Sequence, residues 1–250
     1  MSNFTKWRSL VDGRDLGIPD SEADQKLIHR WVLTDDDGSL GVADSEGNAD
    51  GTNNGVSLVT SSNFADGAAG EGDGSSHIET TTLGSFGSDV GNGCAVAFTI
   101  DISASSRSTV LGSINDSTDD ILETAVNIDG DFNSDEGNVQ MRVRDSNTNE
   151  LTADLGATSL NDGQPHRVVW NIVDPSNNDV EGYFDQTEST TLVRTEGPSN
   201  FSDWDTALML FARSNRGTPD DQMDGIIDDV CLFGEALTTT EAQSYNNPWD

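Results

Sequence analysis

The sequence predicts an all-β fold in which two antiparallel sheets pack into a sandwich. Short segments that alternate apolar and polar residues recur along the whole chain, as half-buried strands do. Turns rich in Gly, Asn, Asp and Ser separate these segments, and 25 of the 250 residues are glycine. No long segment has the apolar spacing of a helix, so we expect helices to be few and short.

The chain length suits one all-β domain with a short extension. Residues 1–26 contain turn formers and Pro19 but no sustained alternation. We therefore expect an irregular N-terminal extension that packs on the domain or docks elsewhere. Residues 27–250 are expected to form the sandwich.

The first predicted strand, residues 27–33, is followed by tight turns up to Thr52. Residues 94–102, CAVAFTIDI, are almost continuously apolar, which predicts a central strand that is covered on both faces. Residues rich in β-branched and apolar side chains predict further strands at 56–60, 77–83, 108–114 and 121–128.

In the second half, residues 138–146 alternate, and we expect Arg142 and Arg144 to face water. Residues 207–214 begin with a continuous apolar run that is typical of a central strand. The same patterns predict strands at 150–156, 166–173, 179–185, 190–195 and 226–233. A short helix should close the chain, with Thr238 as N-cap and Glu241 completing a capping box.

The net charge of the chain is unusual. Asp and Glu number 45 against 12 Lys and Arg, which gives a formal net charge of -33. At about 1 M salt the Debye length is roughly 3 Å, so carboxylates on one surface repel each other little. At about 0.01 M salt the Debye length is roughly 30 Å, and the repulsion extends across the surface. Scattered acids with only two lysines therefore predict a halophilic source. The charge excludes nucleic acid as a partner, because affinity for phosphates rests on Lys and Arg.

No segment approaches the roughly 20 apolar residues of a membrane span, so we expect no membrane insertion. The start, MSNFTKWRSLVDGRD, lacks the apolar core of a secretory signal. In a chain without an export signal, Cys94 and Cys231 are expected to be buried thiols, with a disulfide as the alternative.

The closing segment, Asp224 to Asn247, carries a resemblance to a known family. The residues involved are Gly225, Ile227, Asp228, Asp229, Val230, Ala236, Leu237, Thr238, Glu241 and Tyr245. Residues 42–52 and 160–172 match the same family in the same order. The sequence thus resembles the laminin-G-like jelly-roll domains of the concanavalin A-like lectin/glucanase superfamily.

This resemblance implies a jelly-roll sandwich that recognises glycans or proteins on a concave sheet or on rim loops. The Glu, apolar, Asp, apolar, Glu pattern of the family's glucanases is absent, so we expect no catalytic residues and no enzyme. His166 falls at the position of the family's strand-entry histidine, where a structural role is implied.

Several relatives in this family hold a structural ion, which makes calcium a possible cofactor. The candidate ligands are Asp44, Asn48 and Asp228, because hard cations take oxygen ligands from such turns. The alternative is an Asx-type turn in which the Asp44 carboxylate accepts backbone N–H groups.

A glycan site needs rings for the apolar sugar face and planar polar groups for its hydroxyls. Residues 200–217 supply the candidate ligand-binding residues Trp204, Arg213 and Asn215. The alternative for Trp204 is a packing role under a loop.

These points together predict a surface-exposed virion protein of a haloarchaeal virus, assembled in the cytoplasm without a signal peptide. Its partners would be a cell-surface glycan or glycoprotein, and other virion proteins through residues 1–26. A homo-oligomer is left open. The alternatives are a carbohydrate-binding module of a secreted or cell-surface haloarchaeal protein, and a divergent glycoside hydrolase.

Overall fold

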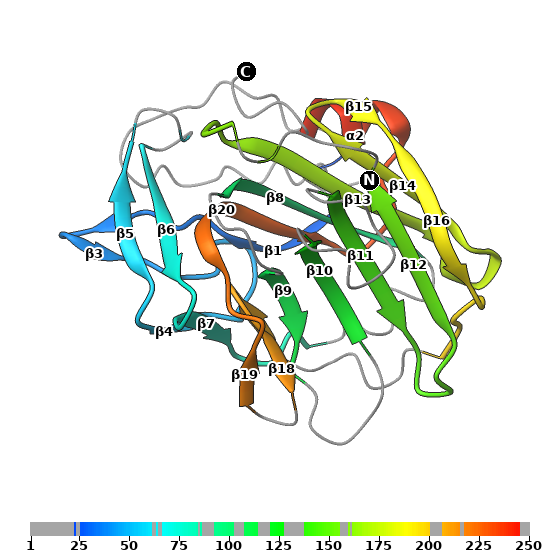
Figure 1. Cartoon of the computed structure of the whole chain (residues 1–250), viewed down its shortest axis with the longest axis horizontal. Helices are drawn as coiled ribbons and strands as arrows, with labels where there is room; N and C mark the ends of the chain where they lie inside the picture. The colour runs from blue at the N-terminus through cyan, green and yellow to red at the C-terminus, as the bar shows by residue number, and fades with distance from the viewer. Residues whose placement is uncertain are drawn as a thin grey trace, which may run out of the picture.

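The computed structural model shows two eight-stranded sheets packed face to face, as the sequence predicts (Figure 1). It describes residues 23, 26–61, 64, 67–84, 86, 93–102, 108–114, 121–127, 138–155, 160, 162–200, 207–215 and 218–245. Every pairing between the described strands is antiparallel.

The first sheet, sheet I, has the order β15-β14-β13-β8-β20-β6-β5, and β1 also pairs with β20. Its strands are β1 (Leu27–Trp31), β5 (Ser57–Thr60), β6 (Ala68–Asp73), β8 (Cys94–Ile102), β13 (His166–Asp174), β14 (Asp179–Phe184), β15 (Thr187–Glu188) and β20 (Asp224–Phe233). A single 3₁₀ turn, η1 (Pro175–Asn177), joins β13 to β14.

The second sheet, sheet II, has the order β16-β12-β11-β10-β9-β17-β7-β4. Its strands are β4 (Gly51–Asn54), β7 (His77–Thr80), β9 (Ser108–Ser113), β10 (Ile121–Asn127), β11 (Asn138–Arg144), β12 (Glu150–Leu155), β16 (Thr190–Thr195) and β17 (Leu208–Leu210). Two small hairpins complete the fold: β2 (Asp35–Asp36) with β3 (Ser39–Leu40), and β18 (Arg213–Asn215) with β19 (Thr218–Asp220).

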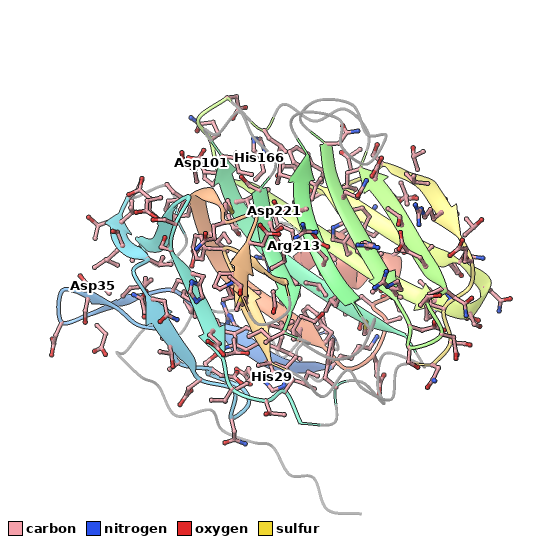
Figure 2. All side chains as sticks on the ribbon, turned by 60° about the horizontal axis from the view of Figure 1, so that its bottom comes forward. His29, Asp35, Asp101, His166, Arg213 and Asp221 are labelled. Carbon is pink, nitrogen blue, oxygen red and sulfur yellow. The ribbon has the colours of Figure 1, made fainter. Side chains whose placement is uncertain are left out.

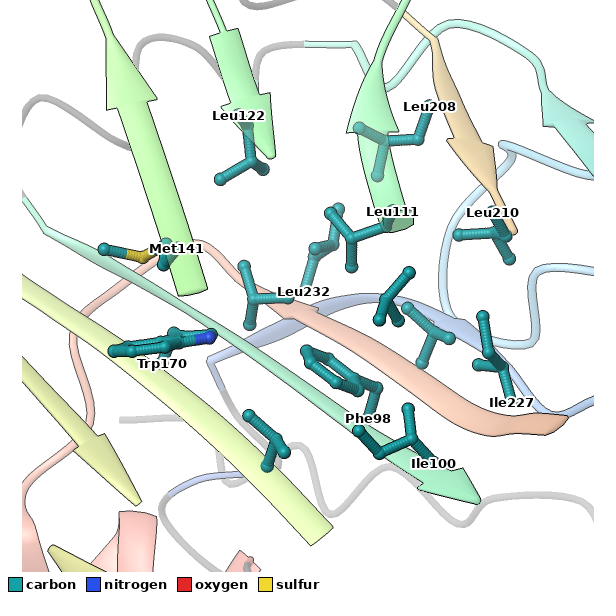
Figure 3. Packing of buried hydrophobic residues seen from close by; sticks show 14 of the residues in the cluster. Phe98, Ile100, Leu111, Leu122, Met141, Trp170, Leu208, Leu210, Ile227 and Leu232 are labelled. Carbon is teal, nitrogen blue, oxygen red and sulfur yellow. The ribbon is translucent and has the colours of Figure 1, made fainter. Parts of the chain in front are cut away.

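Side chains from the inner faces of both sheets form one core. Trp170 and Phe98 from sheet I meet Met141, Leu122 and other apolar residues from sheet II (Figure 3). All four side chains are almost completely inaccessible to solvent. This contact between the sheets is the main source of hydrophobic stabilisation, at roughly 25 cal/mol per Å² of apolar surface buried.

Three strands of the two large sheets, β4, β6 and β15, were not predicted, and the run at 207–214 was predicted as one continuous strand. The sequence of β6, Ala68–Asp73, is rich in glycine and therefore resembles a turn. In the structure the strand needs glycine at position 72, because a Cβ there would lie 2.8 Å from Cδ1 of Phe211. The sequence of β4, Gly51–Asn54, also has the composition of a turn, so it was not predicted as a strand. The run at 207–214 is interrupted after three strand residues, because Phe211 adopts a φ of 67° and turns the chain into β18.

Strand β20 has different neighbours along its two halves. One edge pairs with β8, while the other pairs with β6 over Asp224–Ile227 and with β1 over Val230–Phe233. Where the neighbour changes, the register with β8 shifts and Asp229 adopts a φ of 48°. The strand therefore carries a β-bulge at the junction, which re-aims the Asp229 side chain.

Two arginines hold the Asp229 carboxylate. Arg30 on β1 donates from Nε to Oδ1 at 2.6 Å, and Nη1 of the buried Arg167 on β13 lies 3.4 Å from Oδ2. Arg167 also donates to the Asp229 carbonyl at 2.9 Å. Although burial alone raises the pKa of Asp229, attraction to Arg167 and Arg30 lowers it below the ordinary value. Three strands are thus joined through one carboxylate.

Part of the outer face of sheet I, on β1, β8, β13, β14 and β20, packs against the C-terminal helix α2 (Thr239–Tyr245). The predicted capping box is confirmed: the Thr238 amide donates to Glu241 at 2.6 Å, and the Glu241 amide donates to the Thr238 hydroxyl at 3.3 Å. Lys26 pairs with Glu241 at 2.8 Å, so the residue before β1 is tied to this helix. Among the described residues, no helix is long and apolar enough to span a membrane.

We predict that Asp229→Asn destabilises the protein by about 2 kcal/mol, because it leaves the buried Arg167 without its counter-charge. Asparagine tolerates the same positive φ, so the effect reports on the charge. Urea unfolding measures the change. The matched control is Asp224→Asn on the exposed start of the same strand, and an equal effect of both variants would contradict the role given to Asp229.

Candidate functional site

The outer side of sheet II carries polar residues that are shielded from solvent. Along β10, β11 and β12, core residues such as Leu122, Met141 and Leu151 alternate with polar ones. We call the polar set the polar face: Glu123, Gln140, Arg142, Glu150, Thr152 and Asp154, with Arg213, Asp220 and Asp221 from the adjoining hairpin. Five of them, Glu123, Gln140, Glu150, Thr152 and Asp154, are each at most 5% exposed.

Charged groups form a continuous row across this face. Nη2 of Arg142 on β11 lies 2.6 Å from Glu150 on β12, and its Nη1 lies 4.0 Å from Glu123 on β10. Glu150 also accepts Arg194 of β16 at 3.2 Å. Although burial alone raises the pKa of Glu150, hydrogen bonding and attraction to Arg142 outweigh it and lower the pKa. The Glu150 carboxylate therefore stays ionised near neutral pH.

The β18–β19 hairpin extends the row at its other end. Nη2 of Arg213 lies 2.9 Å from Asp221 and 3.2 Å from Asp220, and Nη1 lies 3.8 Å from Glu123. Figure 2 shows Arg213 and Asp221 close together over the strands of the sheet. Gly112 on β9 makes room for the arginine, since a Cβ there would lie 2.9 Å from Cβ of Arg213.

The base of this hairpin is fixed to the sheet by backbone bonds. The Thr109 amide donates to the Asp221 carbonyl at 2.8 Å, and the Phe211 amide donates to the Val110 carbonyl at 2.8 Å. Arg213 is thereby placed over β9 and β10 by strand geometry and not by a loose loop.

Two donors on the polar face have no hydrogen-bond partner in the part of the chain that the structure describes. The Nε atoms of Arg142 and Arg213 are both buried and make no hydrogen bond. A buried donor without an acceptor costs about 1–3 kcal/mol. Such atoms are rare in folded proteins and call for an explanation, such as a bound water or ligand oxygen.

The predicted ligand-binding residues are only partly placed by the structure. Arg213 lies on the polar face, and the backbone of Asn215 ends β18. Trp204 and the side chain of Asn215 lie outside the described residues. These three assignments stay predictions.

Arg142 lies on the outer face of sheet II, as the alternation predicts, but its side chain is only 17% exposed because it pairs with Glu150. The sequence reasoning also missed Glu123 and Glu150. The available signal for this face was that Gln140, Arg142 and Arg144 are polar at alternate positions, because alternate residues of a strand lie on the same side of a sheet.

The predicted calcium ligands have other contacts in the structure. The Asp44 carboxylate accepts five N–H groups, those of His29 Nδ1 at 2.6 Å and of the backbone of Arg30, Glu46, Gly47 and Ala49. This geometry matches the alternative of an Asx-type turn. Asn48 is exposed, and Asp228 is buried and accepts the Asp229 amide. Within the described part of the chain, no group of three His, Cys, Asp or Glu could hold a metal ion. Calcium stays a prediction that EDTA treatment can test.

Comparison with known proteins supports the fold. No protein-family model and no curated protein matches the chain. Among solved structures, it is similar to domain 4 of AbnA, an extracellular GH43 arabinanase from Geobacillus stearothermophilus, in complex with arabinotriose. The TM-score is 0.62 at 18% identity, over 89% of this chain and 98% of that domain.

Binding domains of a mosquitocidal protein and of a neurotoxin are also similar. The binding domain of Paraclostridial mosquitocidal protein 1 gives a TM-score of 0.66 at 11% identity over 91% of this chain, and that of botulinum neurotoxin DC, in complex with SialylT, gives 0.62 at 12% over 90%. The chain spans about half of each, 53% and 52%. At these identities the likeness shows a jelly-roll β-sandwich fold, and the finer resemblance to laminin-G-like domains stays a prediction.

A histidine ion pair at the rim of sheet I is sensitive to pH. His166, which begins β13, lies with Nδ1 2.7 Å from Asp185 and Nε2 3.1 Å from Asp162, and its ring stacks on Phe184. The hydrogen bond to Asp185 outweighs burial and raises the pKa of His166 above 6.5. These contacts fit the structural role that the resemblance implies.

We predict that this pair stabilises the fold in acid and less so in base. Because the folded-state pKa is raised, the contribution is fully present below about pH 6.5 and is lost as the pH rises through the folded-state value. The difference in unfolding free energy between wild type and His166→Gln should therefore shrink from pH 6 to pH 9. Urea unfolding at several pH values measures it, and a difference that does not change with pH would contradict the prediction.

Proposed function

We propose that the chain is a non-enzymatic recognition module that binds a glycan on the polar face of sheet II. The observation that carries this proposal is the row of charged side chains with two buried guanidinium Nε–H donors that lack protein acceptors. Carboxylates accept hydrogen bonds from sugar hydroxyls, and guanidinium groups donate to them in a fixed plane. The polar face therefore offers both kinds of partner within one rigid sheet.

The arrangement of the sandwich favours this face as the site. Part of the outer face of sheet I is occupied by α2 and its apolar contacts, including Leu237 and Ala242. The arabinanase domain was solved with arabinotriose and matches over nearly its whole length, which supports a carbohydrate ligand. The toxin domains match over half their length, so the SialylT bound to one of them gives weaker support.

The finer proposal is a surface protein of a haloarchaeal virion that binds a host-surface glycan. Its support is the net charge of -33, which suits molar salt. The proposed contact to other virion proteins is residues 1–26. Most of this segment, residues 1–22, lies outside the described residues. An antibody to residues 27–250 distinguishes the readings: signal on purified virions supports a virion protein, whereas signal only in cell envelope or medium supports a cellular module.

Salt dependence tests the halophilic part of the proposal. We predict that near-UV circular dichroism is lost on dialysis from about 1 M KCl to about 0.01 M, because the unscreened carboxylates repel each other over roughly 30 Å. Retention of a cooperative fold in dilute buffer would contradict it.

For the binding site, we predict that Arg142→Gln weakens the affinity for the bound oligosaccharide by about tenfold, close to the contribution of one charged hydrogen bond. A glycan array in molar KCl that includes arabinotriose identifies the ligand, and calorimetry measures its Kd. The matched control is Arg30→Gln, which removes the same charge from sheet I and should lower stability but leave Kd unchanged.

Two results would contradict the proposed function. The first is unchanged affinity in the Arg142→Gln variant while Arg30→Gln weakens binding. The second is release of reducing sugar from the bound glycan by the wild-type protein, which would establish a glycosidase.

A further inference from the structure

The charges on the polar face alternate in sign from one side of the sheet to the other. Starting at the hairpin, the row runs in the order Asp220 and Asp221, Arg213, Glu123, Arg142, Glu150 and Arg194. It therefore contains four carboxylates and three guanidinium groups, and each guanidinium lies within 4.0 Å of at least one carboxylate.

Among the described residues, this row has no excess of positive charge for an anionic ligand. Glu123 lies between Arg142 and Arg213, at 4.0 Å and 3.8 Å, at the centre of the row. A sugar carboxylate that approached either arginine would also approach Glu123, and like charges at such distances oppose binding. Beside the row, Asp154 on β12 adds a further carboxylate, which accepts Gln140 at 2.7 Å.

A neutral sugar meets a different environment. Its hydroxyl groups each carry a donor and acceptor sites, so neighbouring hydroxyls can donate to a carboxylate and accept from a guanidinium. Among the described residues of the polar face, the buried Nε–H groups of Arg142 and Arg213 are donors without acceptors. Where binding opens the face enough to reach them, a sugar hydroxyl or ring oxygen would satisfy them without bringing a charge under low-dielectric conditions.

We infer that the polar face is selective for neutral oligosaccharides with adjacent hydroxyl groups and rejects glycans that carry carboxylates, such as uronates and sialosides. This inference rests on the proposed function, because it concerns the ligand class of the same site. A preference for neutral ligands also fits a sequence in which Lys and Arg number only 12, because few cationic side chains are present to bind an anion. Selectivity arises from Glu123 placed between two arginines, and not from the net charge of the surface alone.

The test compares neutral and carboxylated oligosaccharides of matched length on the full chain. An array of both kinds is read in molar KCl, after near-UV circular dichroism has shown that the protein is folded. Arabinotriose and trigalacturonate are then compared by calorimetry. We expect neutral ligands to bind at least about tenfold more tightly, a difference of about 1.4 kcal/mol.

Glu123→Gln provides the second variant. It keeps the shape of the side chain but removes the central negative charge, so affinity for trigalacturonate should rise by about fivefold while that for the neutral sugar changes less. The control is Glu79→Gln, which removes the same charge from an exposed position on β7 of the same sheet and should change neither.

The outcomes separate this inference from the proposed function. Binding of carboxylated glycans as tight as that of neutral ones, or tighter, overturns the inference but leaves glycan binding intact. An equal effect of Glu123→Gln and Glu79→Gln also overturns it. Absence of binding to any glycan on the array overturns the proposed function and the inference together.

Discussion

The Asp229 carboxylate, held by Arg30 and Arg167, is the interaction on which the rest of the structure depends. It fixes the bulge at which β20 exchanges β6 for β1, and β20 is the strand that joins both parts of sheet I. Arg30 and Asp229 are 199 residues apart in the chain. Sheet I is therefore completed only when the last strand is in place, and such non-local pairing is expected to make folding slow.

The same strand helps to cover part of one outer face of the sandwich. Beyond the bulge, Cys231 and Phe233 turn outward beneath α2 and cover part of that side of the molecule with apolar contacts. Along β10, β11 and β12, the outer side of sheet II is built from ion pairs instead. The protein has 12 Lys and Arg residues, and three of them lie in this one row: Arg142, Arg194 and Arg213.

Local signals explain what could be predicted from the sequence. The capping box at Thr238 and Glu241 involves residues three apart, and the long apolar run of β8 needs no partner to be recognised. The glycine-rich β6 could not be predicted, since its reason is the ring of Phe211, which is distant in sequence. The site was missed for a similar reason: Arg142, Glu123 and Arg213 meet only through the register of β9, β10 and β11 and through the turn at Phe211.

The central claim is that ligand oxygens bind the arginines of the polar face. Side-chain Nε–Hε signals of arginine in a ¹⁵N-edited NMR spectrum, recorded in molar KCl with and without the tightest-binding oligosaccharide, test it most directly. We expect the signals of Arg142 and Arg213 to shift and to exchange more slowly with solvent, while those of Arg30 and Arg167 stay unchanged. Binding that leaves both Arg142 and Arg213 unchanged would contradict the account.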